Sequence, residues 1–273
     1  MTERWSVSWS HTSSVSAHNS TVRCHVLIFN ELSVTFIQIK LELCFVSYQI
    51  HLYASDELQS HCEDEHNNPT QAIDRMETYL EHAYDRMGAD SSVTAKDDRV
   101  HAPDQNFTDP FTTYQPCDTT YKKSYDGLLD WWAEHAQAYC NDRDNADFCN
   151  ILVTAGRGDN DNPLISGGQA DMSHFAVCVT GIMAAKVPAS YQEYGMGGEY
   201  RAVRTPHHEL GHQMMGYVNH SHDKGATFRN GTPDHYMTPM YVQGEQNDCG
   251  EAQSTFGSRG WEQKWSDCCE KEW

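Results

Sequence analysis

The sequence predicts an α+β fold, because strand patterns and helix patterns both occur along it. Residues 34–53 contain an alternating apolar and polar pattern that is typical of a β-strand. Residues 70–87 place apolar side chains at helical spacing, and residues 147–154 form an apolar-rich run typical of a buried strand. A chain of 273 residues can hold one large domain and an extension, and we expect the domain over residues 34–273.

The N-terminal third begins without regular structure. Residues 1–33 follow no strand or helix pattern, so we expect an irregular extension there. Residues 34–53 then predict one strand, or two in succession. One face of its middle part is apolar and the other polar; the apolar residues are Ile37, Ile39, Leu41 and Leu43, and the polar ones are Gln38, Lys40 and Glu42.

Two helices are predicted in the middle of the chain. The first begins at residues 68–70 and ends at Met87, where Gly88 supplies a stop. Residues 89–122 are polar, contain three prolines, and predict a long loop with short strands. The second helix covers about residues 124–139, and its Trp131-Trp132 pair is expected to pack in the core.

Apolar runs and glycines alternate in the next part. The strand at 147–154 is followed by an acidic loop that is rich in glycine and asparagine. Residues 175–185 predict another strand. Residues 194–198 are rich in glycine but follow no clear strand, so they predict a flexible loop rather than a phosphate-binding loop.

Residues 207–212 read His-His-Glu-Leu-Gly-His and contain the pattern His-Glu-x-x-His. His208 and His212 lie on one helix face, so their imidazoles can share one metal ion, and Zn²⁺ is the usual ion for such ligands. Glu209 is placed to take a proton from metal-bound water. His207 points away from this face, and we expect it to support a ligand or to be solvated.

The helix that contains this pattern is predicted to be short. Thr205 is a typical N-cap residue, Pro206 suits the first helical position, and Gly216 suits the stop. A short helix lets the chain return a third ligand to the metal. The near candidates are His220, His222 and Asp223.

Together with the Tyr-Met-Thr-Pro sequence at 236–239, this pattern resembles the metzincin zinc metallopeptidases, especially the reprolysin (adamalysin-like) branch. The resemblance implies an α+β fold with a twisted mixed sheet, an active-site helix, a second long helix, and an irregular C-terminal subdomain after the zinc helix. In that family a methionine-containing turn forms a floor beneath the zinc, which implies this role for Met237.

The chain departs from the family pattern near the third ligand. The family's glycine position is occupied by Met215, and the stretch from Gly216 to the next histidines is longer. Asn219 stands where counting from Gly216 would place the third histidine. We take His222 as the third ligand because Asp223 follows it and because of its distance to the methionine turn.

Other third ligands stay open at this point. His220 is the alternate to His222. A different class of zinc peptidase uses a distant glutamate, and Glu245 or Glu251 could serve in that way. The resemblance also implies an edge strand before the zinc helix, and by analogy we place substrate binding along residues 164–170. An ordinary edge strand is the alternative.

Composition limits the partners. The formal net charge is -20, and because residues 1–55 contain equal numbers of acidic and basic side chains, the excess lies in 56–273. Such a surface repels nucleic acid and anionic membranes, so we expect neither as a partner. The charge favours either cationic substrate segments or solubility alone, and it does not indicate an oligomeric state.

Ten cysteines, without a Cys-x-x-Cys pair, indicate disulfides and an extracellular location. We expect Cys249 and the Cys268-Cys269 pair to staple the C-terminal segment. Four Asn-x-Ser/Thr sites agree with secretion: Asn19, Asn106, Asn219 and Asn230. Residues 1–20 lack the apolar core of a signal peptide, so we expect that the given start is incorrect or truncated.

These observations predict a secreted zinc-dependent endopeptidase that hydrolyses protein or peptide substrates, with Glu209 as the general base. The metal ligands would be His208, His212 and His222. The alternative is a non-catalytic binding protein or toxin that is stabilised by zinc on the same fold.

Overall fold

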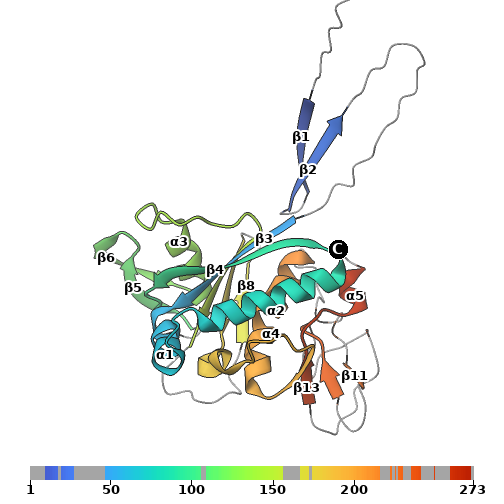
Figure 1. Cartoon of the computed structure of the whole chain (residues 1–273). Helices are drawn as coiled ribbons and strands as arrows, with labels where there is room; N and C mark the ends of the chain where they lie inside the picture. Colours follow the sequence, from blue (N-terminus) through green and yellow to red (C-terminus); the bar gives the residue numbers. More distant parts are fainter. Residues whose placement is uncertain are drawn as a thin grey trace, which may run out of the picture.

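The computed structural model has mixed α and β structure, as the sequence predicts (Figure 1). The description below covers residues 10–17, 20–27, 47–105, 109–155, 167–171, 174–215, 222, 225, 227–229, 235–240, 249 and 259–271. The four Asn-x-Ser/Thr asparagines lie outside these residues. Within the described residues, no helix combines the length and the apolar character that crossing a membrane requires.

A twisted five-stranded sheet forms the centre of the molecule, in the order β4-β3-β7-β9-β8 (Figure 1). Strands β4, β3, β7 and β9 run parallel to one another, and β8 pairs antiparallel with β9 at one edge. The sheet is therefore mixed, as predicted. Its strands are β3 (Ser47–Ser55), β4 (Asp90–Val100), β7 (Cys149–Thr154), β8 (Gly167–Ala170) and β9 (Phe175–Val179).

Side-chain alternation in these strands builds two apolar cores, one on each face of the sheet. In β7, Ile151 and Val153 face the core that includes the helices α1 (Asp56–His66), α2 (Gln71–Met87) and α4 (Gly198–Met214). Leu152 faces the opposite core, which includes α3 (Leu128–Gln137). Every residue of β7 is buried, as expected for a central strand covered on both faces.

The first part of the chain differs from the prediction. Residues within 1–33 form two strands, β1 (Ser10–Ala17) and β2 (Ser20–Leu27), which pair antiparallel (dark blue in Figure 1). The expectation of an irregular segment is wrong for these stretches. The serine-rich sequence of β1 shows no strand pattern, whereas in β2 Val22, Cys24 and Val26 do alternate with polar residues, a signal that the prediction did not use. Of the predicted strand at 34–53, residues 47–53 are observed within β3; residues 34–46, which contain the alternating pattern, lie outside the described part.

The helix predicted up to Met87 is confirmed as α2, and Gly88 ends it in the left-handed conformation. Helix α1 was not predicted, because few of its side chains are apolar; its N-cap is Ser55, whose hydroxyl accepts from the Leu58 amide at 3.3 Å. The long strand β4 occupies part of the predicted loop at 89–122. Helix α3 is shorter than predicted, and its two tryptophans are buried as expected.

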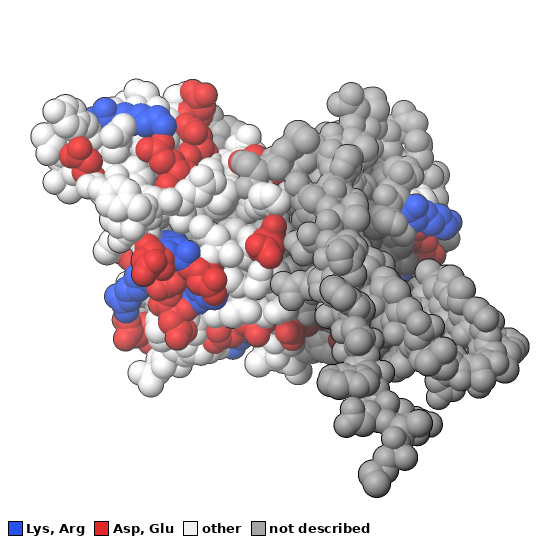
Figure 2. All heavy atoms as spheres, turned by 90° about the horizontal axis from the view of Figure 1, so that it is seen from above, with Lys and Arg blue, Asp and Glu red and all other residues white. Residues whose placement is uncertain are grey.

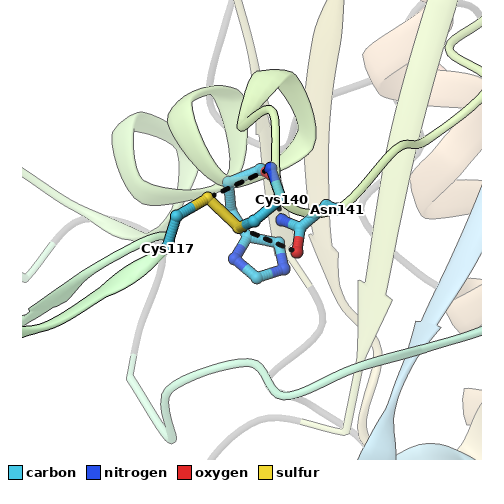
Figure 3. The surroundings of a disulfide bond; sticks show 4 residues. Cys117, Cys140 and Asn141 are labelled. Carbon is cyan, nitrogen blue, oxygen red and sulfur yellow. Dashed lines mark hydrogen bonds between the residues drawn. A yellow bond between two sulfur atoms is a disulfide. The ribbon is translucent and has the colours of Figure 1, made fainter.

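A two-stranded hairpin, β5 (Phe111–Gln115) and β6 (Asp118–Tyr125), extends from the α3 side of the sheet (Figure 1). The disulfide Cys117–Cys140 joins the turn of this hairpin to the residues after α3 (Figure 3). There the Cys140 amide donates to Cys117 Sγ at 3.2 Å. The disulfide compensates for the small apolar contact of an exposed hairpin.

The segment after β9 corrects two further predictions. Strand β9 ends at Val179, well before residue 185, because Gly181 has φ 59° and begins the 3-10 helix η1 (Gly181–Lys186). The predicted flexible loop at 194–198 contains the strand β10 (Tyr194–Met196), which pairs antiparallel with β13 (Arg259–Glu262). Pairing with a distant strand has no local sequence signal.

The described residues of the C-terminal part include regular structure, which the prediction of an irregular subdomain did not contain. Strands β11 (Thr227–Arg229) and β12 (His235–Met237) complete a small sheet in the order β10-β13-β12-β11, and α5 (Asp267–Glu270) follows. Strands this short contain too few residues to show a period. The disulfide Cys249–Cys268 closes this part as expected, and Cys269 is buried.

Candidate metal centre

Helix α4 supplies two of the histidines, and it begins at Gly198, well before the predicted N-cap Thr205. Pro206 therefore lies inside the helix, where it lacks the amide hydrogen for one backbone bond. The Thr205 hydroxyl donates to the Arg201 carbonyl at 3.1 Å, and both residues 205 and 206 are buried. Tertiary packing thus outweighs the local start signal. The helix ends at Met214, and Gly216 lies outside the described residues.

The structure brings three histidine side chains to one point. The Nε2 atoms of His208 and His212 are 3.1 Å apart. The Nε2 atom of His222 lies 3.2 Å from each of them. The sequence-predicted ligands His208, His212 and His222 are thus brought together, and within the described residues they form the group that could hold a metal ion.

Hydrogen bonding cannot account for all three contacts. A neutral imidazole nitrogen either donates or accepts, so among three mutually close nitrogens at least one pair must have the same role. One metal ion satisfies all three lone pairs together. A tetrahedral ion with bonds of about 2.0–2.1 Å separates its ligands by about 3.3–3.4 Å, close to the observed triangle.

A backbone carbonyl fixes the tautomer of His208. Its Nδ1 lies 2.7 Å from the Pro239 carbonyl oxygen, which can only accept, so Nδ1 donates and Nε2 presents its lone pair to the other histidines. Burial holds the pKa of His208 well below its usual range, and the neighbouring Arg204 adds to this. Arg204 also donates from Nη2 to the same carbonyl. His208 is therefore held as a neutral ligand.

Glu209 is buried between the helix and the sheet, with 3% of its surface exposed. Burial raises its pKa to about 8, and the nearby Arg204 acts in the opposite direction. Its side chain lies against Gly168 of the edge strand β8. A carboxyl group in this position can take up and release a proton near neutral pH.

The other face of α4 packs in the core. His207 is fully buried; its Nδ1 lies 3.0 Å from the Val203 carbonyl oxygen, and its ring is 5.5 Å from that of Trp265. The expectation that His207 might be solvated is therefore wrong. Gly211, one helical turn further on, lies on the same core-facing side of the helix as His207. Burial lowers the pKa of His207 to about 4.

The segment of the predicted methionine turn lies beside the helix, although a second methionine makes the closest contact. Met237 is buried in β12, where it pairs with Trp261 of β13. Met240 places its Sδ atom where a side chain at Gly211 would begin. A role of Met237 as a floor for the metal stays a prediction.

The predicted edge strand is observed over residues 167–170 as β8. It lies at the end of the central sheet and contacts α4. The first part of the predicted substrate segment, residues 164–166, lies outside the described residues, as do the alternate ligands His220, Asp223, Glu245 and Glu251 and the glycosylation-site residue Asn219.

Sequence reasoning missed the groups that orient the histidines. Arg204 could have been found, because it lies one helical turn before His208 on the same face. The Pro239 carbonyl is a backbone group and has no residue signature. Trp265, whose Nε1 donates to the His207 carbonyl at 2.9 Å, lies far along the chain and gave no signal.

Comparisons with known proteins do not assign this chain to a family. No protein-family model matches the chain, and no curated protein matches it. The resemblance to the metzincins therefore stays a prediction from the residues of the chain itself.

Proposed function

We propose that this chain is a secreted zinc-dependent endopeptidase of the metzincin type. The observation that most supports the proposal is the triangle of three imidazole nitrogens, with Glu209 placed between two of the ligands in the sequence. Nitrogen ligands favour Zn²⁺ over Ca²⁺ and Mg²⁺, which prefer oxygen. Three protein ligands leave a position for substrate and water, as in catalytic zinc sites.

His208, His212 and His222 would hold the ion. Zn²⁺, when bound, supplies a Lewis acid that polarises a carbonyl and lowers the pKa of water. Glu209 accepts a proton from the attacking water and then gives it to the nitrogen of the leaving amine.

The substrate would bind along the outer edge of β8. The free edge of a sheet offers backbone amides and carbonyls, which an extended peptide can pair with. Because β8 lies beside Glu209, a peptide in this position has its backbone near the general base. Acidic side chains cover more of the described surface than basic ones in Figure 2, which favours cationic substrate segments.

Secretion is supported by the disulfides. Cys117–Cys140 and Cys249–Cys268 are of the kind that persists in oxidising compartments. The thiols of three further cysteines are free and are protected by burial: Cys62, Cys149 and Cys178.

The test compares the zinc-loaded wild type with Glu209→Gln, using casein and gelatin as substrates and measuring the metal content. We expect Glu209→Gln to keep one zinc per chain and to lose about 100- to 10,000-fold in activity, because the general base is gone and the ligands remain. Chelation should abolish wild-type activity. Full activity in Glu209→Gln contradicts the proposal.

Two controls sharpen this test. His222→Ala should lose stoichiometric zinc, whereas His220→Ala should keep it if His222 is the third ligand. The alternative function, a non-catalytic binding protein or toxin stabilised by zinc, predicts a wild type that retains zinc, melts at lower temperature after chelation, and hydrolyses neither substrate.

A further inference from the structure

Strand β8 approaches helix α4 so closely at Gly168 that a side chain would not fit. A Cβ atom at this position would lie 2.6 Å from Glu209 Oε1 and 2.8 Å from Glu209 Cγ. It would also lie 2.8 Å from the Val177 carbonyl oxygen. Real Cβ atoms almost never make contacts below 3.0 Å. Gly168 does not have a positive φ, so space rather than backbone conformation requires glycine here.

A second link fixes the end of the same strand to the helix. Gln213, directly after His212, donates from Nε2 to the carbonyl of Asp171 and, at 3.3 Å, to that of Phe175. These two residues lie at the ends of the connection between β8 and β9, where the Phe175 amide also donates to Asp171 Oδ1 at 3.1 Å. The connection is thus tied to α4 one residue beyond a metal ligand.

We propose that Gly168 is a positioning residue for Glu209, and that Gln213 holds β8 in the arrangement that makes this possible. The proposal rests on the proposed function, since it concerns how a peptide on β8 meets the general base. The missing side chain lets the strand lie directly on the Glu209 carboxyl group. The depth of the bound peptide backbone relative to Glu209 is then set by contact rather than by a flexible loop.

An alanine at position 168 would change this depth. Either Glu209 rotates away from the strand, or β8 moves outward from the helix, and both movements lengthen the distance from Glu209 to a bound peptide. The nearest atoms to the added Cβ belong to Glu209 and Val177 and to none of the three histidines. The metal ligands should therefore stay in place.

The first experiment measures steady-state kinetics and metal binding of zinc-loaded Gly168→Ala with a peptide substrate. We expect kcat to fall about 10- to 100-fold with KM unchanged, because the general base is displaced while peptide binding to the strand edge persists. Zinc content and the visible absorption spectrum of the Co²⁺-substituted form should match those of the wild type. An unchanged kcat, or a changed Co²⁺ spectrum, overturns the proposal.

A matched control separates positioning from a general loss of stability. Val93 is buried in β4, at the opposite edge of the same sheet. Val93→Ala should lower Tm through a cavity and leave kcat unchanged. If Val93→Ala reduces kcat as much as Gly168→Ala does, the effect at Gly168 is not specific and the proposal is wrong.

The second experiment does not depend on activity. Tm is measured for Gly168→Ala, Glu209→Ala and the double variant. We expect Gly168→Ala to lower Tm less in the Glu209→Ala background, because the truncated side chain leaves room for the new Cβ. Additive changes in Tm overturn the inference whatever the activity. If the changes in Tm are coupled but the wild type cleaves no peptide, the proposed function is wrong, and the contact between Gly168 and Glu209 is still supported.

Discussion

Helices α2 and α4 are both 17 residues long and contact each other, yet they are built differently. In α2 seven residues are buried, and all of them are apolar or aromatic. In α4 ten residues are buried, and they include Thr205, His207, Glu209 and Gln213. One helix therefore presents a single apolar stripe, whereas the other buries polar groups on several sides.

The difference shows that burying polar groups in a helix has an energetic cost. Burying a polar group costs free energy unless it has a partner, so α4 depends on specific contacts from other elements. The Pro239 carbonyl serves His208, and the Val203 carbonyl serves His207. The stripe of α2 is stabilised mainly by apolar area, and its two tyrosine hydroxyls, of Tyr79 and Tyr84, donate to the Ser190 carbonyl and to Met214 Sδ. Changes in α4 should therefore have effects that helix propensity alone would not predict.

The largest such effect is expected at Gly211. Replacing glycine by alanine inside a helix normally stabilises it by about 1 kcal/mol. Here the new Cβ would meet Met240 Sδ and would lie 3.0 Å from Trp265 Nε1. We expect Gly211→Ala to lower the free energy of unfolding by about 2–3 kcal/mol through overpacking. Urea unfolding of the metal-free proteins measures it.

The comparison with α2 supplies the control. Glu81 is exposed on α2, and Glu81→Gly should destabilise by about 1 kcal/mol through propensity alone. The expected sign at Gly211 is thus the reverse of the propensity rule, and at Glu81 it follows the rule. A stabilised Gly211→Ala would show that the contact with Met240 does not constrain the helix.

A smaller effect tests whether α4 begins at Gly198, as observed, or at Thr205, as the sequence pattern predicts. If the helix begins at Gly198, Pro206 interrupts it, and Pro206→Ala restores one backbone donor. We expect this variant to gain about 1–2 kcal/mol in the free energy of unfolding, less than the full cost of an internal proline because some packing is lost. Calorimetry on the zinc-free form measures the change in Tm.

The opposite result has a clear meaning. If residue 206 were the first helical position, as the sequence pattern suggests, proline would be favourable there and its replacement would leave stability unchanged or reduce it. A loss of stability in Pro206→Ala would therefore return the start of the helix to Thr205.

Local spacing explains which features the sequence could predict. The stripe of α2 and its stop at Gly88 are local, and so is the pair of His208 and His212, because a helix turn alone brings them together. The buried strand β7 was recognisable from its composition. In each case the information lies within one element.

The remaining features depend on contacts between distant segments. Gly168 and Glu209 meet because β8 packs on α4, and nothing near either residue indicates this. Met240 rather than Met237 contacts Gly211, a choice made by the path of the chain after β12. The strand β10 exists because β13 pairs with it. Tertiary packing determines all three, so local patterns could not predict them.

The smallest expected effect tests whether burial controls the pKa of an acid outside the metal centre, as it does for Glu209 of α4. Glu262 in β13 is buried, and burial raises its pKa to about 7, although Lys264 and Arg86 of α2 act in the opposite direction. Because the folded protein holds this proton more tightly than the unfolded chain, the contribution of Glu262 to stability is present below about pH 4.5 and is lost as pH rises through about 7.

Replacing the acid by its amide should remove this pH dependence. We expect the free energy of unfolding of Glu262→Gln, relative to wild type, to increase by about 1 kcal/mol between pH 6 and pH 7. Urea unfolding at the two pH values measures it, and Glu81→Gln at an exposed position of α2 is the control. Parallel pH profiles for wild type and Glu262→Gln would mean that Glu262 has the same pKa in the folded and unfolded protein and that its cationic neighbours balance burial. Glu209 and Glu262 would then differ, because burial is the larger effect on the pKa of Glu209 although Arg204 acts in the opposite direction.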